Sequence, residues 1–440
     1  MNLPDGPLSR RALFGNSALL GLGAAFAPHA AFAKPAAAQA AQFPNVTAFV
    51  DGYVAKRKVP GMLAMMGFGQ GKATVIARGT EGFNDRDAET MDTLFRVYSM
   101  TKPVTGMAAM TLIDDGKLSL DQPLSDILPK FAKMMVQVTP DGSITDLRAA
   151  KTPITIRMLL THSAGLGYSI IQKGPIKDAF VAAGVVPGQV SKVPIPGLER
   201  GQAVGSLALF ADRLAALPLV YEPGTQWSYS VGLDLMGRVI EVVSGKPFDV
   251  FLQERLFGPL GMVSTGFQVK AKDIHRLSTN YAVVAGTPIP IDPAEASIFA
   301  EKPPFPMGGA GLVTSPRDYD RFLRMIANYG VIDGKRVMSE RAIRTGTSNL
   351  LPPGASTKGT FANGAGFGAG GRVGLGDAAG TYGWGGAAGT VALVDLKVGL
   401  RGSLYTQYMP SEAYSVHADF PVAVMADLKA MAPARRNQAV

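Results

Sequence analysis

Val97-Tyr98-Ser99-Met100-Thr101-Lys102-Pro103 puts a serine three residues before a lysine, where an extended run is expected to turn into a helix. Side chains three apart on a helix share a face, with about 5–6 Å between Cβ atoms, so the amine can lie beside the serine oxygen. A desolvated lysine can supply or relay the base that a serine hydroxyl needs, and the helix N-terminus adds free N–H groups. The motif therefore predicts an activated nucleophile at Ser99, with Lys102 as its neighbour.

The amino-acid composition excludes several kinds of function and site for this chain. The chain has 440 residues, 47% of them hydrophobic and 18% charged, which is ordinary for one large or two moderate globular domains. The net charge of +9 is scattered, without a basic run or interleaved aromatics, which argues against a nucleic-acid partner. The absence of cysteine excludes disulfides, thiolate metal sites, a cysteine nucleophile and a lipid anchor on cysteine. We see no cofactor motif and expect neither a cofactor nor a metal.

Histidine is almost as scarce. The four histidines are His29, His162, His275 and His417. No Gly-x-Ser-x-Gly elbow occurs, so a Ser-His-Asp triad of the α/β-hydrolase type is not expected. His162 is the rival candidate for a base, because imidazole titrates near neutrality.

The N-terminus has the pattern of an export signal. Residues 1–33 contain Ser9-Arg10-Arg11-Ala12-Leu13-Phe14, a twin-arginine motif, followed by a short apolar stretch from Ala18 to Ala27. Small-residue sites predict cleavage after residue 33 or after residue 40. The alternative, a membrane anchor, is disfavoured by the shortness of this stretch. We expect a periplasmic or secreted protein that meets the twin-arginine export machinery transiently and has no stable membrane anchor after cleavage.

Periodicity places the main elements. A helix over 46–59, capped by Asn45, precedes two strands over 61–68 and 72–78 that form a hairpin. The helix of Ser99 is expected to end near Gly116. Further helices are predicted over 231–243 and from Ser315, and two β-runs over 390–395 and 400–407.

The order of these elements predicts the architecture. Strands near both ends of the chain indicate one antiparallel sheet flanked by helices, an α/β (α+β) fold. The expected domains are an α/β domain over 43–116 and 305–432, and a mainly helical inserted domain over 117–304. A cleft is expected where they join.

A second motif is Trp227-Ser228-Tyr229-Ser230-Val231, which follows a turn. A tyrosine at a loop-to-helix junction can point into a cleft, where a nearby ammonium would favour its phenolate form. Phenolate is a plausible base for a serine proton. The alternative for Tyr229 is an aromatic ring packed in the core.

A third motif is Tyr382-Gly383-Trp384-Gly385-Gly386-Ala387-Ala388-Gly389-Thr390, leading into a strand. Gly385 and Gly386 let a backbone approach a ligand closely, and an N–H there can bind a developing oxyanion. A β-bulge or turn is the alternative. Both tryptophans of the chain, Trp227 and Trp384, lie in these motifs and suit an apolar substrate, although either could pack in a core.

Taken together, these motifs resemble the serine β-lactamase and penicillin-binding-protein superfamily, and within it the class C β-lactamase-like family VIII carboxylesterases. The resemblance runs from about Phe43 to Pro410. It also includes the segments Ile156 to Leu166, Pro223 to Thr225 and Gly308 to Leu312.

The resemblance implies a β-lactamase/transpeptidase-like fold and roles for particular residues. Ser99 would be the acylated nucleophile, Lys102 its proton partner and Tyr229 the general base. The N–H groups of Ser99 and Ala387 would form the oxyanion hole, and the segment of His162 looks structural. The residues expected to bind substrate are Trp384, Gly385, Gly386, Tyr98 and Trp227.

Two departures from class C β-lactamases bear on the substrate. Their Tyr-x-Asn has Val231 at its third position here, and their Lys-Thr-Gly is replaced by Trp384-Gly385-Gly386. Loss of a fixed cation removes about 1.5–3 kcal/mol of charge-assisted hydrogen bonding to an anionic substrate. A tryptophan favours neutral, apolar esters instead.

The expected function is therefore that of a serine esterase acting on a small-molecule ester through an acyl-enzyme. A class C-type β-lactamase, a D-alanyl-D-alanine carboxypeptidase and an acyltransferase stay open. So does a non-catalytic penicillin-binding sensor module, because a fold alone does not guarantee turnover. The segments 133–151 and 167–205 are expected to shape the pocket.

Overall fold

The computed structural model describes residues 41–186, 188–193, 195 and 201–436. The predicted export signal and both of its candidate cleavage points lie outside these residues. Within the described ranges, no helix has the length and apolar character needed to cross a membrane.

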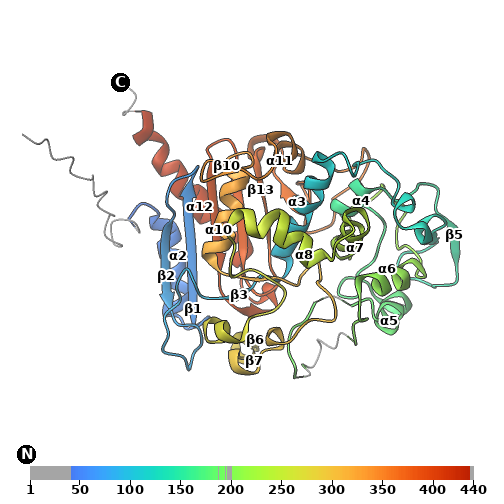
Figure 1. Cartoon of the computed structure of the whole chain (residues 1–440). Coiled ribbons are helices and arrows are strands. Elements are labelled where there is room, and N and C mark those ends of the chain that lie inside the picture. The colour runs from blue at the N-terminus through green and yellow to red at the C-terminus, as the bar shows by residue number, and fades with distance from the viewer. Residues whose placement is uncertain (1–40, 187, 194, 196–200, 437–440) are drawn as a thin grey trace, which may run out of the picture. The chain divides into compact units, whose positions relative to one another are not determined.

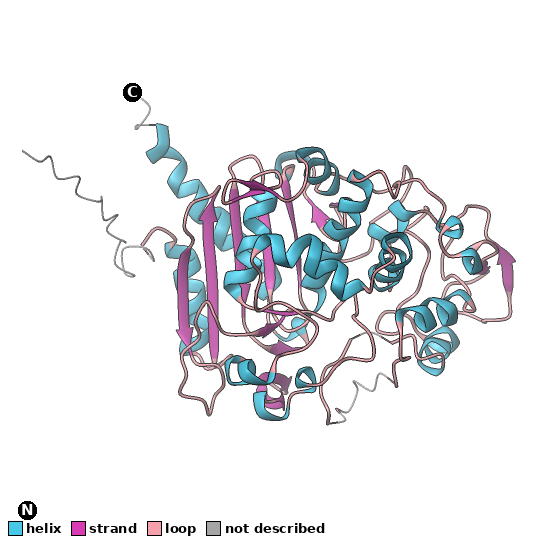
Figure 2. Ribbon diagram, viewed as in Figure 1, coloured by secondary structure: helices cyan, strands magenta, loops and turns pink. Residues whose placement is uncertain are grey.

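An antiparallel sheet of seven strands lies at the centre of the fold (Figures 1 and 2). Its order is β11-β12-β13-β14-β15-β1-β2. The strands are β1 (Gly61–Phe68), β2 (Thr74–Gly79), β11 (Gly366–Phe367), β12 (Arg372–Val373), β13 (Thr381–Gly385), β14 (Val391–Asp395) and β15 (Leu400–Tyr405). Because β1 pairs with β15, with Leu63 opposite Tyr405, the early and late parts of the chain meet in one sheet. The predicted sheet and fold class are confirmed.

The other elements are helices and shorter strands. The helices are α2 (Pro44–Ala55), α3 (Thr101–Asp114), α4 (Ile156–Leu160), α5 (Gly174–Ala182), α6 (Leu207–Ala215), α7 (Gly232–Ser244), α8 (Phe248–Leu252), α9 (Gly258–Leu260), α10 (Pro316–Ala327), α11 (Glu340–Gly346) and α12 (Val416–Arg436). The smaller strands are β3 (Phe95–Arg96), β4 (Met135–Gln137), β5 (Leu147–Ala149), β6 (Asn280–Val284), β7 (Thr287–Asp292), β8 (Val313–Thr314), β9 (Val331–Ile332), β10 (Lys335–Arg336) and β16 (Tyr408–Met409). Single 3₁₀ or π turns occur at Tyr98–Met100, Leu124–Asp126, Pro129–Phe131, Gln253–Phe257, Ala271–Arg276, Ala294–Ala296, Ile298–Ala300, Gly376–Ala378 and Ser411–Ala413.

Both faces of the sheet are covered, which explains why β1 is apolar along its whole length. Successive side chains of a strand point to opposite faces. Met62 and Ala64 therefore join the core beneath α2 and α12, whereas Leu63 and Met65 join the larger core that contains α3 and α10. All four side chains are buried.

The start of α2 corrects one prediction. The helix begins at Pro44, and Asn45 makes no capping bond within it. Instead, the Asn45 side-chain amide and backbone N–H donate to Oδ1 of Asp427 in α12, at 2.7 and 2.9 Å. A carboxylate from another helix thus satisfies the free N–H groups at this helix start, and it favours the positive end of the helix dipole. The helix also ends at Ala55 rather than at residue 59.

The other predicted helices lie where the periodicity placed them. The helix that follows Ser99 ends at Asp114, α7 ends just before Gly245, and the Ser315 hydroxyl accepts the N–H of Asp318 at the start of α10. Helices α4 to α9 all come from the segment 117–304, and α7 packs directly on α3. The predicted division into two domains stays a prediction.

Candidate active site

Ser99 lies in a single 3₁₀ turn, Tyr98–Met100, between strand β3 and helix α3. The turn places Ser99 two residues before the start of α3 at Thr101, so Lys102 follows within the first helical turn. Nζ of Lys102 lies 3.3 Å from Oγ of Ser99 and donates to it. Lys102 is fully buried, and its second hydrogen bond goes to the carbonyl of Gly309 at 2.7 Å.

A buried arginine holds the strand that leads to this turn. Arg96 donates from Nε to Oδ2 of Asp292 at 2.6 Å, and from its other nitrogens to the Ser278 and Asp292 carbonyls. Its own N–H donates to the side chain of Gln407 at 3.1 Å. A guanidinium presents a rigid fork of donors, so these bonds fix the backbone three residues before Ser99.

Tyr229 lies three residues before the start of α7 and points back at the nucleophile. Its hydroxyl donates to Oγ of Ser99 at 2.7 Å, and Nζ of Lys102 lies 4.5 Å from the centre of its ring. The packing of α7 on α3 brings these three side chains together. The arrangement can pass a proton between the phenol and the serine without an imidazole.

His162 lies beside this group but does not contact Ser99 in any hydrogen bond of the described residues. Its Nδ1 accepts the backbone N–H of Ser230 at 3.2 Å, and its ring lies 4.8 Å from that of Tyr229. Burial and the charge of Lys102 lower the pKa of His162 well below its ordinary value of 6.5. The ring is therefore neutral, and it packs against the ring of Tyr229.

The end of β13 comes close to the nucleophile because of a glycine. A Cβ on Gly386 would lie 2.3 Å from the carbonyl oxygen of Val97, too close for any side chain. The N–H of Gly386 donates to the Thr390 carbonyl, which closes a tight turn and leaves Ala387 at its tip. Ala387 lines the same cavity as Ser99, and its N–H donates to no backbone carbonyl of the described residues, as its predicted part in the oxyanion hole requires.

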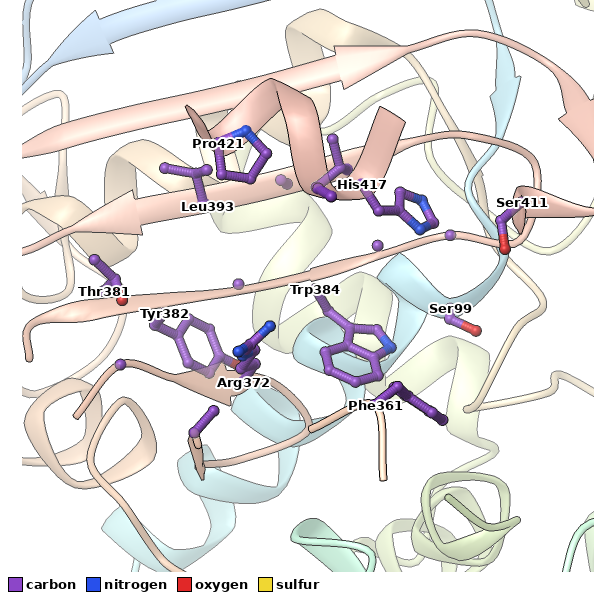
Figure 3. A pocket seen from close by; sticks show the side chains of 18 of the residues that line it. Ser99, Phe361, Arg372, Thr381, Tyr382, Trp384, Leu393, Ser411, His417 and Pro421 are labelled. Atoms are coloured by element: carbon purple, nitrogen blue, oxygen red, sulfur yellow. The ribbon is translucent and has the colours of Figure 1, made fainter. Parts of the chain in front are cut away.

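A cavity of about 910 Å³ opens beside Ser99 and follows β13. Figure 3 shows Ser99, Trp384 and Phe361 on one side of β13, with His417 and Pro421 on the other. The rings of Trp384 and Phe361 are 5.9 Å apart, and that of Tyr229 is 5.8 Å from Trp384. Aromatic surface therefore surrounds the nucleophile.

Three of the residues expected to bind substrate line this cavity: Trp384, Gly385 and Gly386. Tyr98 and Trp227 are not among the residues that line it, and their role in substrate binding stays a prediction. Both are almost fully buried. The Tyr98 hydroxyl accepts a hydrogen bond from Asn280, and the Trp227 ring is stacked 6.2 Å from that of Tyr229. Both rings belong to the hydrophobic core, where their burial stabilises the fold next to the site.

Sequence reasoning did not single out Phe361, Ile170 and Ile171, which also line the cavity and expose 59%, 49% and 38% of their surface. The signal for Phe361 was a lone aromatic in a segment of Gly, Thr and Asn. The isoleucines fall in the segment 167–205, which was expected to shape the pocket. None of the described residues that line the cavity comes from 133–151.

The site is made of hydroxyl groups, an amine and aromatic rings. In the part of the chain that the structure describes, no three His, Cys, Asp or Glu side chains gather in a way that could hold a metal ion. The serine hydroxyl thus lies within hydrogen-bonding distance of both a phenol and an amine, an arrangement that can support acyl transfer.

Comparison with known proteins identifies the family of this chain. The Beta-lactamase family profile matches residues 46–424, almost the whole described chain. The chain belongs to the beta-lactamase family. The family predicted from the motifs is thereby confirmed.

Three curated proteins match the chain over different shares of their length. Esterase EstB of Burkholderia gladioli is 31% identical over 403 residues, which cover 86% of this chain and 92% of that protein. Protein Rv1367c of Mycobacterium tuberculosis is 35% identical over 266 residues, and the match spans only 62% of its length. The Acyltransferase calJ of Penicillium decumbens is 29% identical over 346 residues, which cover 72% of this chain and 77% of that protein.

Solved structures share the fold. EstCE1, described as a hydrolase with promiscuous acyltransferase activity, has a TM-score of 0.70 and 25% identity, with 88% of this chain and 99% of that chain covered. Simvastatin synthase of Aspergillus terreus, in its LovD9 form, has a TM-score of 0.68 and 22% identity, with 88% and 99% covered. The second likeness concerns the fold alone.

Proposed function

We propose that this protein is a serine carboxylesterase that forms an acyl-enzyme on Ser99. The observation that carries the proposal is the contact of 2.7 Å between the Tyr229 hydroxyl and Oγ of Ser99, with Lys102 beside both. The names of EstB and EstCE1 support an ester as the substrate.

The proposed reaction uses Tyr229 as the base, in its phenolate form, with the Lys102 ammonium beside it. The phenolate takes the proton of Ser99, and Oγ attacks the ester carbonyl carbon. The N–H groups of Ser99 and Ala387 hold the oxyanion. The alcohol then leaves with the proton from Tyr229. A water molecule gives its proton to Tyr229 and attacks the acyl group, and the acid departs as Ser99 regains a proton.

The surroundings of Ser99 favour a neutral, apolar ester. Trp384 occupies the position where class C β-lactamases carry a lysine, and Phe361 and Ile170 extend the apolar surface. Charge-assisted hydrogen bonds are about twice as strong as neutral ones, so an anionic β-lactam would lose a strong contact here. We therefore infer only weak β-lactam turnover.

The test uses p-nitrophenyl butyrate, nitrocefin and a D-alanyl-D-alanine peptide on the same preparation. We expect the ester to react fastest, and a serine-directed phosphonate to label Ser99. Full ester activity in Ser99→Ala, or label on another residue, would overturn the proposal. A protein that stays unmodified or stays acylated would be a sensor instead.

Acyl transfer to an alcohol is a second candidate, because two relatives of this chain carry acyltransferase names. An aromatic and aliphatic pocket can hold an alcohol as readily as an ester tail. Adding an alcohol to the ester assay separates the two outcomes. Ester product would indicate transfer, and acid alone would indicate hydrolysis.

We also propose that the protein is exported by the twin-arginine route to the periplasm or beyond. The support is the Arg10-Arg11 pair in its sequence context. Replacing both residues with lysine should hold the protein in the cytoplasm, as measured by cell fractionation. Unchanged export would contradict the proposal.

A further inference from the structure

Asp234 is a buried acid next to the site that the proposed reaction does not use. It lies in the first turn of α7 and exposes 2% of its surface. Its Oδ1 accepts the N–H of Gly309 at 2.8 Å, whereas Oδ2 has no hydrogen-bond partner among the described residues. An unpaired carboxylate oxygen in a protein interior is costly, and the charge that acts on this one in its favour is that of Lys102.

The same glycine contacts Lys102. The carbonyl of Gly309 accepts the hydrogen bond from Nζ of Lys102 at 2.7 Å. Lys102 is fully buried, and its hydrogen bonds among the described residues go to the neutral groups of Ser99 and Gly309. One glycine therefore separates a buried base from a buried acid, with its N–H on the acid and its carbonyl on the base.

The close approach depends on glycine. A Cβ on Gly309 would lie 2.5 Å from Oδ2 of Asp234, so any side chain would displace the carboxylate. The preceding carbonyl, that of Gly308, accepts the hydroxyl of Thr105 at 2.7 Å. The loop is thus held by three hydrogen bonds, one to Asp234 on α7 and two from α3, donated by Lys102 and by the neutral side chain of Thr105.

We propose that Asp234 positions Lys102 through Gly309 and acts as its counter-charge, which keeps the ammonium fixed beside Ser99 and Tyr229. This inference rests on the proposed esterase function. Asp234 touches neither Ser99 nor a substrate, so it is a positioning residue.

The electrostatics agree with the geometry. Burial raises the pKa of Asp234, and the Lys102 charge opposes that rise. The titratable groups packed around Lys102 are Tyr229 before α7, Tyr168 and His162 in the preceding loops, and Asp234. Asp234 is the only carboxyl group among them.

The test compares Asp234→Asn with Thr105→Val. Asparagine keeps the shape and an acceptor for the Gly309 N–H, but it removes the charge. Valine removes the neutral anchor of the same loop, the hydrogen bond of Thr105 to the Gly308 carbonyl, and changes no charge, so it is the matched control. Each variant is assayed on p-nitrophenyl butyrate from pH 5 to 10, and its melting temperature is measured.

We expect Asp234→Asn to lower kcat about tenfold with little change in KM, because the effect is on the chemical step. Loss of a negative charge lowers the pKa of each neighbouring group, so both limbs of the profile should move to lower pH by about half a unit or more. Thr105→Val should have a lower melting temperature than the wild type, but both limbs of its pH–rate profile should stay at the wild-type pH. Asp234→Ser serves as a second neutral variant if the asparagine form does not fold.

Two results would overturn the inference. One is an Asp234→Asn profile that superimposes on that of the wild type. The other is a loss of activity with unmoved limbs, as in the control, since that would indicate a structural bond alone. A wild-type protein that neither hydrolyses the ester nor takes the phosphonate label would instead contradict the proposed function itself.

Discussion

The hydroxyl of Tyr229 lies 2.7 Å from Oγ of Ser99, although 130 residues separate them along the chain. Lys102 completes the group from the first turn of α3. A serine, a lysine and a tyrosine thus meet in a buried place where charge interactions are stronger than in water.

Removal of the Tyr229 oxygen tests its assignment as the base. Tyr229→Phe keeps the ring packed against Trp227 and Trp384 and deletes only the hydroxyl. We expect kcat on p-nitrophenyl butyrate to fall about 100-fold or more, since general-base catalysis contributes about 10²–10⁴-fold. Wild-type turnover in this variant would eliminate the tyrosine as the base.

His162 offers the contrasting measurement. Asparagine can accept the N–H of Ser230 in place of Nδ1, so His162→Asn should keep ester turnover within about tenfold of the wild type. A loss as large as that of Tyr229→Phe would instead make the imidazole the base.

The depressed pKa of His162 also predicts how stability depends on pH. Its folded pKa lies below the ordinary 6.5, so the unfolded chain binds more protons just below that pH. The free energy of unfolding should therefore fall with pH from about 6.5 down to the folded pKa, by at most about 1.4 kcal/mol per unit for this group. Chemical denaturation at several pH values should show a shallower slope in His162→Asn. Equal slopes would mean that the ring is not held neutral.

The ion pair behind the nucleophile should matter far more than a surface pair. Arg96 and Asp292 are buried, with 0% and 1% side-chain exposure, whereas Arg317 and Asp92 expose 49% and 54%. Arg96→Met leaves a buried carboxylate unpaired and should cost about 3–5 kcal/mol of unfolding free energy. Arg317→Met should cost about 0–1 kcal/mol. Similar losses measured by urea unfolding would show that burial does not decide the difference.

Trp384 sets the choice between neutral and anionic substrates. Trp384→Lys restores a cation at this position and should raise the ratio of nitrocefin to butyrate ester turnover about tenfold or more, because a charged hydrogen bond contributes about 1.5–3 kcal/mol. Trp384→Leu removes the ring without adding charge and should leave that ratio low. If the ratio of nitrocefin to butyrate ester turnover is the same in both variants, Trp384 does not determine the choice between anionic and neutral substrates.

Much of the fold follows from local patterns. The continuous apolar run of β1, the spacing of apolar residues in α7 and the Ser315 cap of α10 are each encoded within a few residues, so local patterns predict them. The cap of α2 could not be predicted this way. Its acceptor, Asp427, is 382 residues from Asn45, and only packing brings them together.

The sequence alone established the nucleophile motif, the scarcity of histidine and the family, because these depend on which residues are present and on their short-range spacing. Folding was needed to seat the Tyr229 hydroxyl on Ser99, to bury Trp227 and Tyr98 away from the cavity, and to bring Phe361 and Ile170 to it. It also joined Asp234 to Lys102 through Gly309. Such contacts join distant segments, and their geometry depends on how α7, α3 and the sheet pack, which no local pattern specifies.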